Sequence, residues 1–136
     1  MKTNVKKEII RTSKAPMGRI PLTQAVRVGD LIFCSGALGL DPSKYPKDMS
    51  LPKDVRLETK QVLENLKTVL EEGGSSLDKV VKVTIFLKDI ASDFDAVNEV
   101  FYKYFPLNTS PARSTVEVVR LALPDARMEV EAVAIA

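Results

Sequence analysis

Arg113 is the side chain with the clearest capacity to bind a small anion. Pro111 precedes it by two residues and favours an extended approach to the strand that Arg113 begins. From the mouth of a strand, a planar guanidinium can donate two parallel hydrogen bonds to a carboxylate. The alternative is a structural ion pair with Glu117, Glu129 or Glu131. Spacing alone favours this alternative, because most arginines are paired or solvent-exposed.

Glu129 and Glu131 lie two residues apart, so an extended chain places both on one face. Carboxylates this close repel each other unless a cation or a water molecule lies between them. One of the two could therefore position or activate a water molecule. The alternative is pairing with Arg113, Arg120 or Arg127, which local spacing again favours.

Cys34, Ser35 and Gly36 end another predicted strand. Gly36 permits a close approach of the backbone, and the Ser35 hydroxyl could donate a hydrogen bond to a ligand. Cys34 has no basic sequence neighbour to stabilise a thiolate, so we expect it to pack in the interior. The glycines that follow match neither the dinucleotide-binding pattern nor the phosphate-loop ending, so nucleotide binding has no motif support.

The composition limits the chemistry, because the 136 residues include no His, no Trp and one Cys. Nucleophile pairs with an imidazole base and His-ligated zinc sites are therefore excluded. A single thiol also excludes Cys-rich zinc sites and an intrachain disulfide. The hydrophobic fraction of 45% and charged fraction of 28% are typical of a soluble globular protein, and the length predicts one domain over residues 1–136. No apolar run approaches the roughly 20 residues of a membrane-spanning helix.

Hydrophobic patterning predicts six strands and two helices in the order β-β-β-α-β-α-β-β. The strands are expected at residues 8–11, 26–29, 30–36, 80–87, 113–121 and 127–135. Residues 31–34 are nearly all apolar, which predicts a strand covered on both faces. Hairpins are expected at both ends of the chain, the last one turning at Leu123-Pro124-Asp125.

The first helix is predicted between a capping Asp54 and the Gly73-Gly74 pair. Its charged residues, Glu58 among them, are assigned largely to the solvent side. Its apolar stripe comprises Val62, Leu63, Leu66, Val69 and Leu70.

The second helix is predicted to begin at a capping Ser92, with Asp95 reaching back to it, and to end at Pro106. With hairpins at both ends and helices between the middle strands, the fold class is α+β with a six-stranded mixed sheet. Two helices can cover only one face of this sheet. The last two strands carry apolar residues on both faces. The second face is therefore expected to be buried by another subunit.

Residues 1–19 are basic, with six Lys and Arg residues against Glu8 alone, a net charge of +5. The remaining residues hold 14 basic and 17 acidic groups, a net charge of −3. A basic start can be a mitochondrial presequence or a nucleic-acid-binding arm, but a solvated first strand after a flexible segment at residues 1–6 is favoured. Few aromatic residues accompany the basic ones, which argues against nucleic-acid binding. The single thiol favours a cytoplasmic location, with a mitochondrial one as the minority alternative.

Two segments near the C-terminus together resemble the signature of the Rid (reactive intermediate deaminase) family. They are residues 111–118, PARSTVEV, and residues 128–134, MEVEAVA. Shorter matches in the same order run through the rest of the chain, among them Gln24-Ala25-Val26, Ser35-Gly36, Lys88-Asp89-Ile90 and Val97-Asn98. The resemblance covers the chain from about residue 7, and its specificity comes from the combination of matches.

This resemblance implies a chorismate-mutase-like fold and a homotrimer whose sheets line a central barrel, with three sites in clefts between subunits. It implies hydrolysis of reactive enamine and imine intermediates, such as 2-aminoacrylate released by pyridoxal-phosphate enzymes, to 2-keto acids and ammonia. The activity would be of the 2-iminobutanoate/2-iminopropanoate deaminase type. The ligand would be a small imino or enamino acid that carries a carboxylate, and the family implies neither a cofactor nor a metal.

The resemblance also implies roles for individual residues. Arg113 matches the arginine that binds the substrate carboxylate, and Glu129 matches the glutamate that helps to position the attacking water. Ser35, Asn98 and the backbone around Thr115 match further elements of the binding pocket.

Leu22 is the main departure from the family. Many members have Tyr after Gly-Pro, where this chain has Ile20-Pro21-Leu22. Leucine cannot donate a hydrogen bond, so the mouth of the pocket should be more apolar, and the preferred imino acid or the level of activity should differ. Leu22 therefore keeps open a second hypothesis, a non-catalytic binder of small carboxylates. A ribonuclease or translation-inhibitor activity is a third, against which the acidic body and the lack of His argue.

Overall fold

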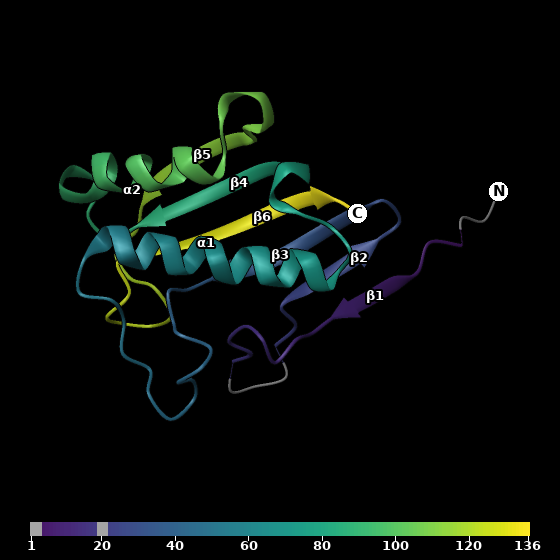
Figure 1. The fold of residues 1–136 in the computed structure, drawn as a ribbon, viewed down its shortest axis with the longest axis horizontal. Coiled ribbons are helices and arrows are strands. Elements are labelled where there is room, and N and C mark those ends of the chain that lie inside the picture. Colours follow the sequence, from purple (N-terminus) through teal and green to yellow (C-terminus); the bar gives the residue numbers. More distant parts are fainter. Residues whose placement is uncertain (1–3, 19–21) are drawn as a thin grey trace.

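Six strands form one mixed sheet, and two α-helices cover one of its faces (Figure 1). The computed structural model describes residues 4–18 and 22–136. The strands are β1 (Lys7–Ile10), β2 (Ala25–Val28), β3 (Leu31–Ala37), β4 (Val80–Leu87), β5 (Ala112–Glu117) and β6 (Met128–Ile135). The helices are α1 (Val55–Glu72) and α2 (Ile90–Tyr104), with short 3₁₀ turns at Leu77–Lys79 and Leu107–Thr109. The predicted α+β class and order of elements are confirmed.

The strand order β1-β2-β3-β6-β4-β5 places β6 between β3 and β4. β6 is antiparallel to both neighbours, whereas β5 is parallel to β4 at the edge of the sheet. The predicted hairpin between the last two strands is therefore wrong. The chain returns through α2 to the starting end of β4, so β5 runs beside β4 in the same direction. β6 does not pair with β5; it lies on the other side of β4, between β4 and β3.

β5 ends at Glu117 rather than at residue 121. Its only neighbour in the sheet, β4, ends at Leu87, which pairs with Glu117. The Leu87 carbonyl then accepts a hydrogen bond from the Val118 N–H at 2.8 Å. Beyond this point no strand of the described residues lies beside β5, so the chain continues as a loop despite its apolar sequence.

α1 begins and ends where the sequence predicts. The Asp54 carboxylate caps the helix by accepting a hydrogen bond from the Arg56 N–H at 2.7 Å. Gly73 follows the last helical residue, and Gly74 takes a φ of 81°, which residues with a Cβ rarely adopt. One prediction for this helix is wrong: the Glu58 side chain is fully buried rather than exposed to solvent.

α2 begins one turn earlier than predicted. Its N-cap is Asp89, whose carboxylate accepts hydrogen bonds from the Ser92 N–H at 3.1 Å and from the Ser92 hydroxyl at 2.9 Å. The predicted cap at Ser92 is therefore wrong, since Ser92 is a donor to the true cap. Val97 and Phe101 of α2 face the core.

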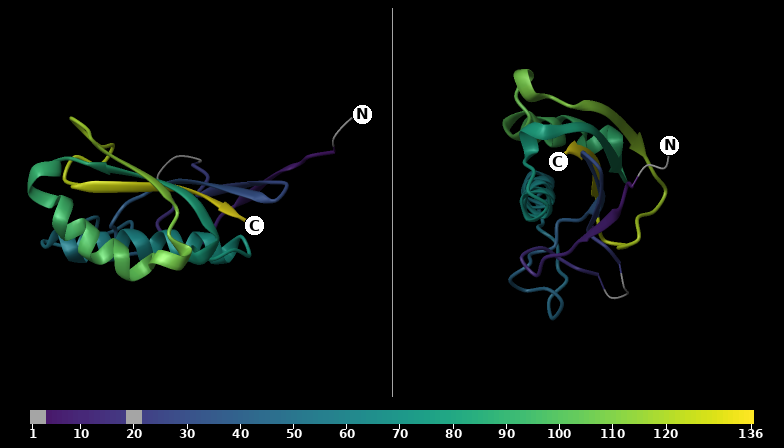
Figure 2. Two further views of the ribbon diagram at one scale, coloured as in Figure 1. Left: turned by 90° about the horizontal axis from the view of Figure 1, so that it is seen from above. Right: turned by 90° about the vertical axis from the view of Figure 1, so that its right-hand side faces the viewer.

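Within one chain, the helices cover one face of the sheet and leave the other face open (Figure 2). On the helix side, Ile32, Val83 and Ile85 are fully buried. On the open side, Leu31 and Phe33 remain 40% and 46% exposed. The expected burial of residues 31–34 on both faces is thus not reached within one chain. No helix in the described part of the chain is long and apolar enough to cross a membrane.

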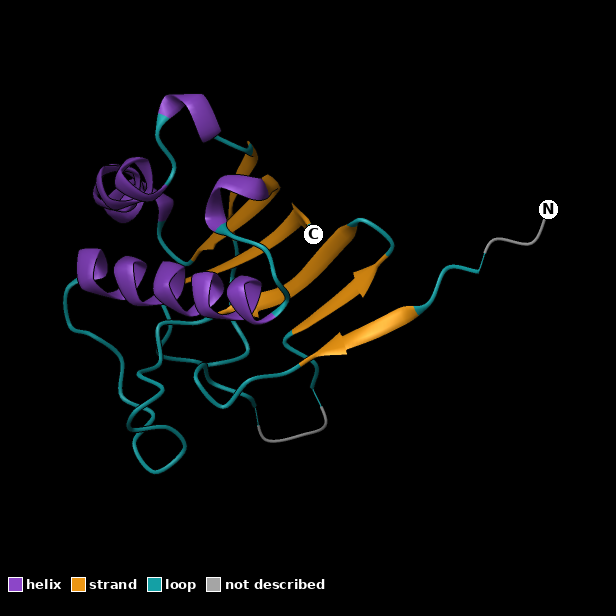
Figure 3. Cartoon of the chain, turned by 45° about the vertical axis from the view of Figure 1, so that its right-hand side comes forward, coloured by secondary structure: helices purple, strands orange, loops and turns teal. Residues whose placement is uncertain are grey.

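β1 forms the edge of the sheet remote from α2 (Figure 3). Among the described strands it pairs only with β2, in antiparallel register. Before it, residues 4–6 of the basic N-terminal segment are exposed and have no regular structure. Residues 1–3 of that segment lie outside the described residues.

Candidate active site

A β-bulge interrupts β3 at Ser35 and Gly36, where β3 holds one residue more than its partner β6. Bulges of this kind redirect side chains and are common beside active sites. The Ser35 hydroxyl donates a hydrogen bond to the Thr23 carbonyl at 2.6 Å, and the Ser35 N–H donates to the Gln24 carbonyl at 2.9 Å. Both bonds fix the exposed Ser35, whose hydroxyl oxygen retains the capacity to accept a hydrogen bond.

Glu129 of β6 lies against this bulge. A Cβ atom at position 36 would stand 1.7 Å from Glu129 Oε1, so the absence of a side chain at Gly36 makes room for the carboxylate. Burial raises the pKa of Glu129, and the charge of Glu131 raises it further. Glu129 therefore holds a proton more readily than an exposed glutamate, which suits a group that exchanges protons with water. The predicted pairing with an arginine is wrong, since neither glutamate forms an ion pair within the described residues.

Arg113 of β5 is held by neutral groups. Its Nη2 donates a hydrogen bond to Asn98 Oδ1 at 2.6 Å, and its Nε donates to Thr115 Oγ1 at 2.8 Å. The guanidinium carbon lies 4.7 Å from the ring centroid of Phe101 and 5.7 Å from that of Phe94. Burial lowers the pKa of Arg113. The favoured structural ion pair is absent, because no carboxylate of the described residues pairs with Arg113.

Arg113 and Glu129 lie on opposite faces of the sheet. Across the strands, Arg113 aligns with Val83, Ala132 and Cys34, whose side chains are all buried on the helix side. Aligned residues share a face, so Arg113 belongs to the helix side, and three strand spacings put it roughly 14 Å from β3. Glu129 is three residues from Ala132 along β6 and therefore faces the open side.

The six predicted site residues thus form two groups within one chain. The arginine half-site consists of Arg113, Asn98 and Thr115, and the glutamate half-site consists of Ser35, Glu129 and Leu22. Leu22 is 58% exposed and lines the same cavity as Ser35. Ile20 and Pro21, which precede it in the departing motif, lie outside the described residues. In the part of the chain that is described, no three His, Cys, Asp or Glu side chains come together as metal ligands.

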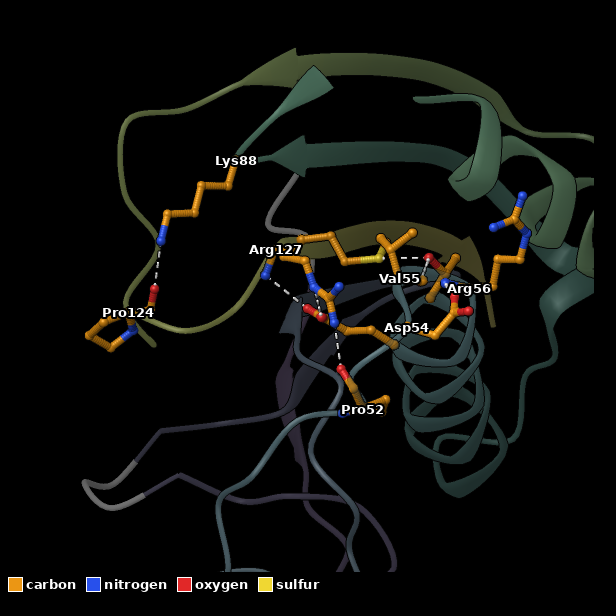
Figure 4. Close-up of polar contacts among 10 residues, drawn as sticks. Pro52, Asp54, Val55, Arg56, Lys88, Pro124 and Arg127 are labelled. Atoms are coloured by element: carbon orange, nitrogen blue, oxygen red, sulfur yellow. Dashed lines mark hydrogen bonds and ion pairs between the residues drawn. The ribbon is translucent and has the colours of Figure 1, made fainter. Parts of the chain in front are cut away.

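An ion pair that the sequence does not predict, between Glu58 and Arg127, anchors the start of β6 (Figure 4). The Glu58 carboxylate accepts hydrogen bonds from the Arg127 backbone N–H and from Arg127 Nε, both at 2.9 Å. Arg127 Nη2 donates to the Pro52 carbonyl, which ties the loop before α1 to the same point. Glu58 stands four residues before Val62, so it continues the apolar stripe of α1. That position was the signal that could have identified it as buried.

Comparisons with known proteins identify relatives of this chain. A family model described as Endoribonuclease L-PSP matches residues 12–136. A RutC family protein of Pyrococcus abyssi is 45% identical over 94% of this chain and 96% of its own. Reactive Intermediate Deaminase A of Arabidopsis thaliana, a chloroplastic protein, is 43% identical over 97% of this chain and 67% of its own. A mouse 2-iminobutanoate/2-iminopropanoate deaminase is 40% identical over 98% of this chain and 94% of its own.

Solved structures show the same fold. The crystal structure of RidA from an Antarctic Psychrobacter has a TM-score of 0.85 and 36% identity, covering 95% of this chain and 99% of that one. The crystal structure of Escherichia coli TdcF with bound serine has a TM-score of 0.84 and 33% identity, covering 95% and 98%. Sequence and fold match along nearly the whole chain, and the protein therefore belongs to the RutC/Rid family.

Proposed function

We propose that this protein hydrolyses small imino acids, and their enamine tautomers such as 2-aminoacrylate, to 2-keto acids and ammonia. A water molecule adds to the carbon of the C=N bond, and the resulting carbinolamine expels ammonia as the carbonyl forms. The deaminase names of the Arabidopsis and mouse relatives support this reaction class. The proposal rests on Arg113, a cation that has no carboxylate partner among the described residues and that suits the carboxylate of every such substrate.

In this proposal the protein works mainly by orientation. Arg113 holds the substrate carboxylate, while Asn98 and Thr115 fix the angle of its guanidinium. Glu129 accepts a hydrogen bond from the attacking water and later exchanges a proton with it, and its raised pKa suits both roles. The imine carbon is already electrophilic, so fixed placement of carboxylate and water supplies much of the rate advantage.

The same proposal includes a homotrimer in which the two half-sites meet between copies of the chain. Within one chain the sheet separates Arg113 from Glu129, so one small substrate cannot touch both. The open face also exposes Phe33 and Ile135, at 46% and 47%, which a second copy would cover. Light scattering on purified protein should give three times the chain mass. Full activity in a monomer would contradict this part of the proposal.

The decisive variant is Arg113→Ala, assayed with imino acids that an amino acid oxidase generates in situ. We expect kcat/KM for keto-acid release to fall at least about 100-fold, because two charge-assisted hydrogen bonds to the substrate are lost. Arg56→Ala is the matched control, since this arginine pairs with Glu99 on the exposed side of α1. Unchanged turnover in Arg113→Ala, with its oligomeric mass intact, would refute the assignment.

A non-catalytic binder of small carboxylates is the second candidate, because exposed Leu22 offers no hydrogen bond at the mouth of the cavity. Thermal stabilisation by small 2-keto acids without turnover of any imino acid would favour it. The family description also names an endoribonuclease. RNA cleavage that persists through purification and is lost in Arg113→Ala would favour that activity instead.

A further inference from the structure

Tyr102 of α2 lies beside Arg113, in the same open depression of the protein surface. Tyr102 follows Asn98 by four residues, and Asn98 follows Phe94 by four, so the three side chains lie along one face of the helix. Asn98 accepts a hydrogen bond from Arg113, and the ring centroid of Phe94 lies 5.7 Å from the guanidinium carbon. The helical spacing therefore continues this row of contacts to Tyr102.

The phenol oxygen of Tyr102 is close enough to act on the guanidinium. Burial lowers the pKa of Arg113, and an electrostatic contact with the Tyr102 phenol opposes this effect. The Tyr102 ring meets the buried Phe101 ring edge to face, with centroids 6.1 Å apart and planes at 78°. This contact restricts the Tyr102 ring, although the residue remains 60% exposed. The hydroxyl is thus held near Arg113 and stays accessible to a ligand.

We propose that Tyr102 is a substrate-binding residue, whose hydroxyl donates a hydrogen bond to the carboxylate that Arg113 holds. This inference rests on the proposed function and adds a specificity-determining residue to it. Asn98 and Thr115 engage only two of the N–H donors of the guanidinium, so others are left for a carboxylate. Each carboxylate oxygen can accept more than one hydrogen bond, so the phenol can donate to the same group. Tyr102 thereby supplies from α2 a hydroxyl donor that Leu22 cannot.

Ser110 and Thr115 carry the other two hydroxyl groups among the described residues at this depression. The Thr115 oxygen already accepts a hydrogen bond from Arg113 Nε at 2.8 Å, so Thr115 serves to orient the arginine. Among the described residues, the Ser110 hydroxyl forms no hydrogen bond with Arg113. Tyr102 is therefore the hydroxyl donor that the contacts of Arg113 favour, and Ser110 is the alternative that an experiment has to separate from it.

The test is isothermal titration of the full chain with 2-oxobutanoate, a stable 2-keto acid that requires no turnover. Tyr102→Phe should weaken its binding about tenfold, the lower end for a hydrogen bond to a charged group, because the site is partly open to water. Tyr104→Phe is the matched control, since this hydroxyl lies on the same helix but donates to Glu64 at 2.9 Å. Tyr104→Phe and Ser110→Ala should both bind the keto acid as the wild type does.

Imine hydrolysis provides a second measurement. The carboxylate keeps its charge throughout the reaction, so its hydrogen bonds stabilise substrate and transition state equally. In Tyr102→Phe the loss should therefore appear in KM, while kcat stays within about twofold of the wild-type value. A purely structural role of Tyr102 would not divide the effect in this way.

The outcomes separate this inference from the proposed function. Unchanged binding and unchanged KM in Tyr102→Phe, or a loss that appears in Ser110→Ala instead, would overturn the role of Tyr102 alone. A wild-type protein that binds the keto acid but accelerates no imine would refute the proposed function, while weaker binding by Tyr102→Phe would still support the carboxylate contact. If the keto acid binds too weakly to titrate, KM decides the matter.

Discussion

Replacing Arg127 by Met should cost about 3 kcal/mol of folding free energy. The substitution leaves the Glu58 carboxylate, which is fully buried, with the backbone N–H of residue 127 in place of two donors. Removing one partner of a buried ion pair typically costs about 3–5 kcal/mol. The lower end applies, because the Arg127 side chain is 32% exposed and water can enter the vacated space. For a chain of 136 residues this corresponds to a fall in Tm of about 10 °C.

The assay is thermal unfolding followed by circular dichroism, at one fixed protein concentration because assembly also affects Tm. Arg56→Met is the control: its ion pair with Glu99 is about half exposed on both sides and should contribute less than about 1 kcal/mol. The double variant Glu58→Leu/Arg127→Met should recover much of the loss, because no buried charge remains. Equal effects of Arg127→Met and Arg56→Met would refute this account of the anchor.

Three further predictions concern Gly36, Glu129 and Cys34. Gly36→Ala should lower kcat/KM at least about 100-fold and cost about 1–3 kcal/mol of stability, because the new Cβ displaces the Glu129 carboxylate. A fully active variant would contradict the close approach of Glu129 to Gly36. Because the folded-state pKa of Glu129 is raised, its contribution to stability is present at low pH and is lost as pH rises through that value. Glu129→Gln should therefore melt above wild type at pH 7 and match it near pH 4, which melting curves at both pH values can test. With its pKa raised to about 12, the Cys34 thiol should react with a disulfide reagent only after unfolding, and rapid labelling of the native protein would count against its burial.

The elements of this fold could be predicted because their signals are local. Asp54 and Gly74 mark the ends of α1 in the sequence itself, and the apolar stripe between them repeats with the helical period. The strand order could not be predicted in the same way. β6 pairs with β3, far away in the sequence, and the loop at residues 118–127 has the same composition whether it closes a hairpin or crosses an intervening strand.

The burial of Glu58 on α1 also depends on a residue far away in the sequence. Glu58 occupies a position of the apolar stripe, but its charge led to its assignment to the solvent side. The residue that neutralises it, Arg127, is 69 positions away. A buried carboxylate is stable only with such a partner, and sequence spacing does not show which arginine reaches it. Arg127 was accordingly considered only as one of three possible partners, with Arg113 and Arg120, for Glu129 and Glu131.

Sequence spacing leaves two roles open for Arg113, a structural ion pair or the binding of a small anion, and the fold decides between them. From the sequence, Glu129 and Glu131 are plausible partners for it. Once β4 lies between β5 and β6, the register places Arg113 on the helix side and both glutamates on the open side, so a pair within one chain is impossible. The guanidinium is met instead by Asn98, Thr115 and an aromatic ring, none of which neutralises its charge. A half-buried cation in these surroundings is stabilised by an incoming anion, and this requirement connects the strand order to the proposed binding of a carboxylate substrate.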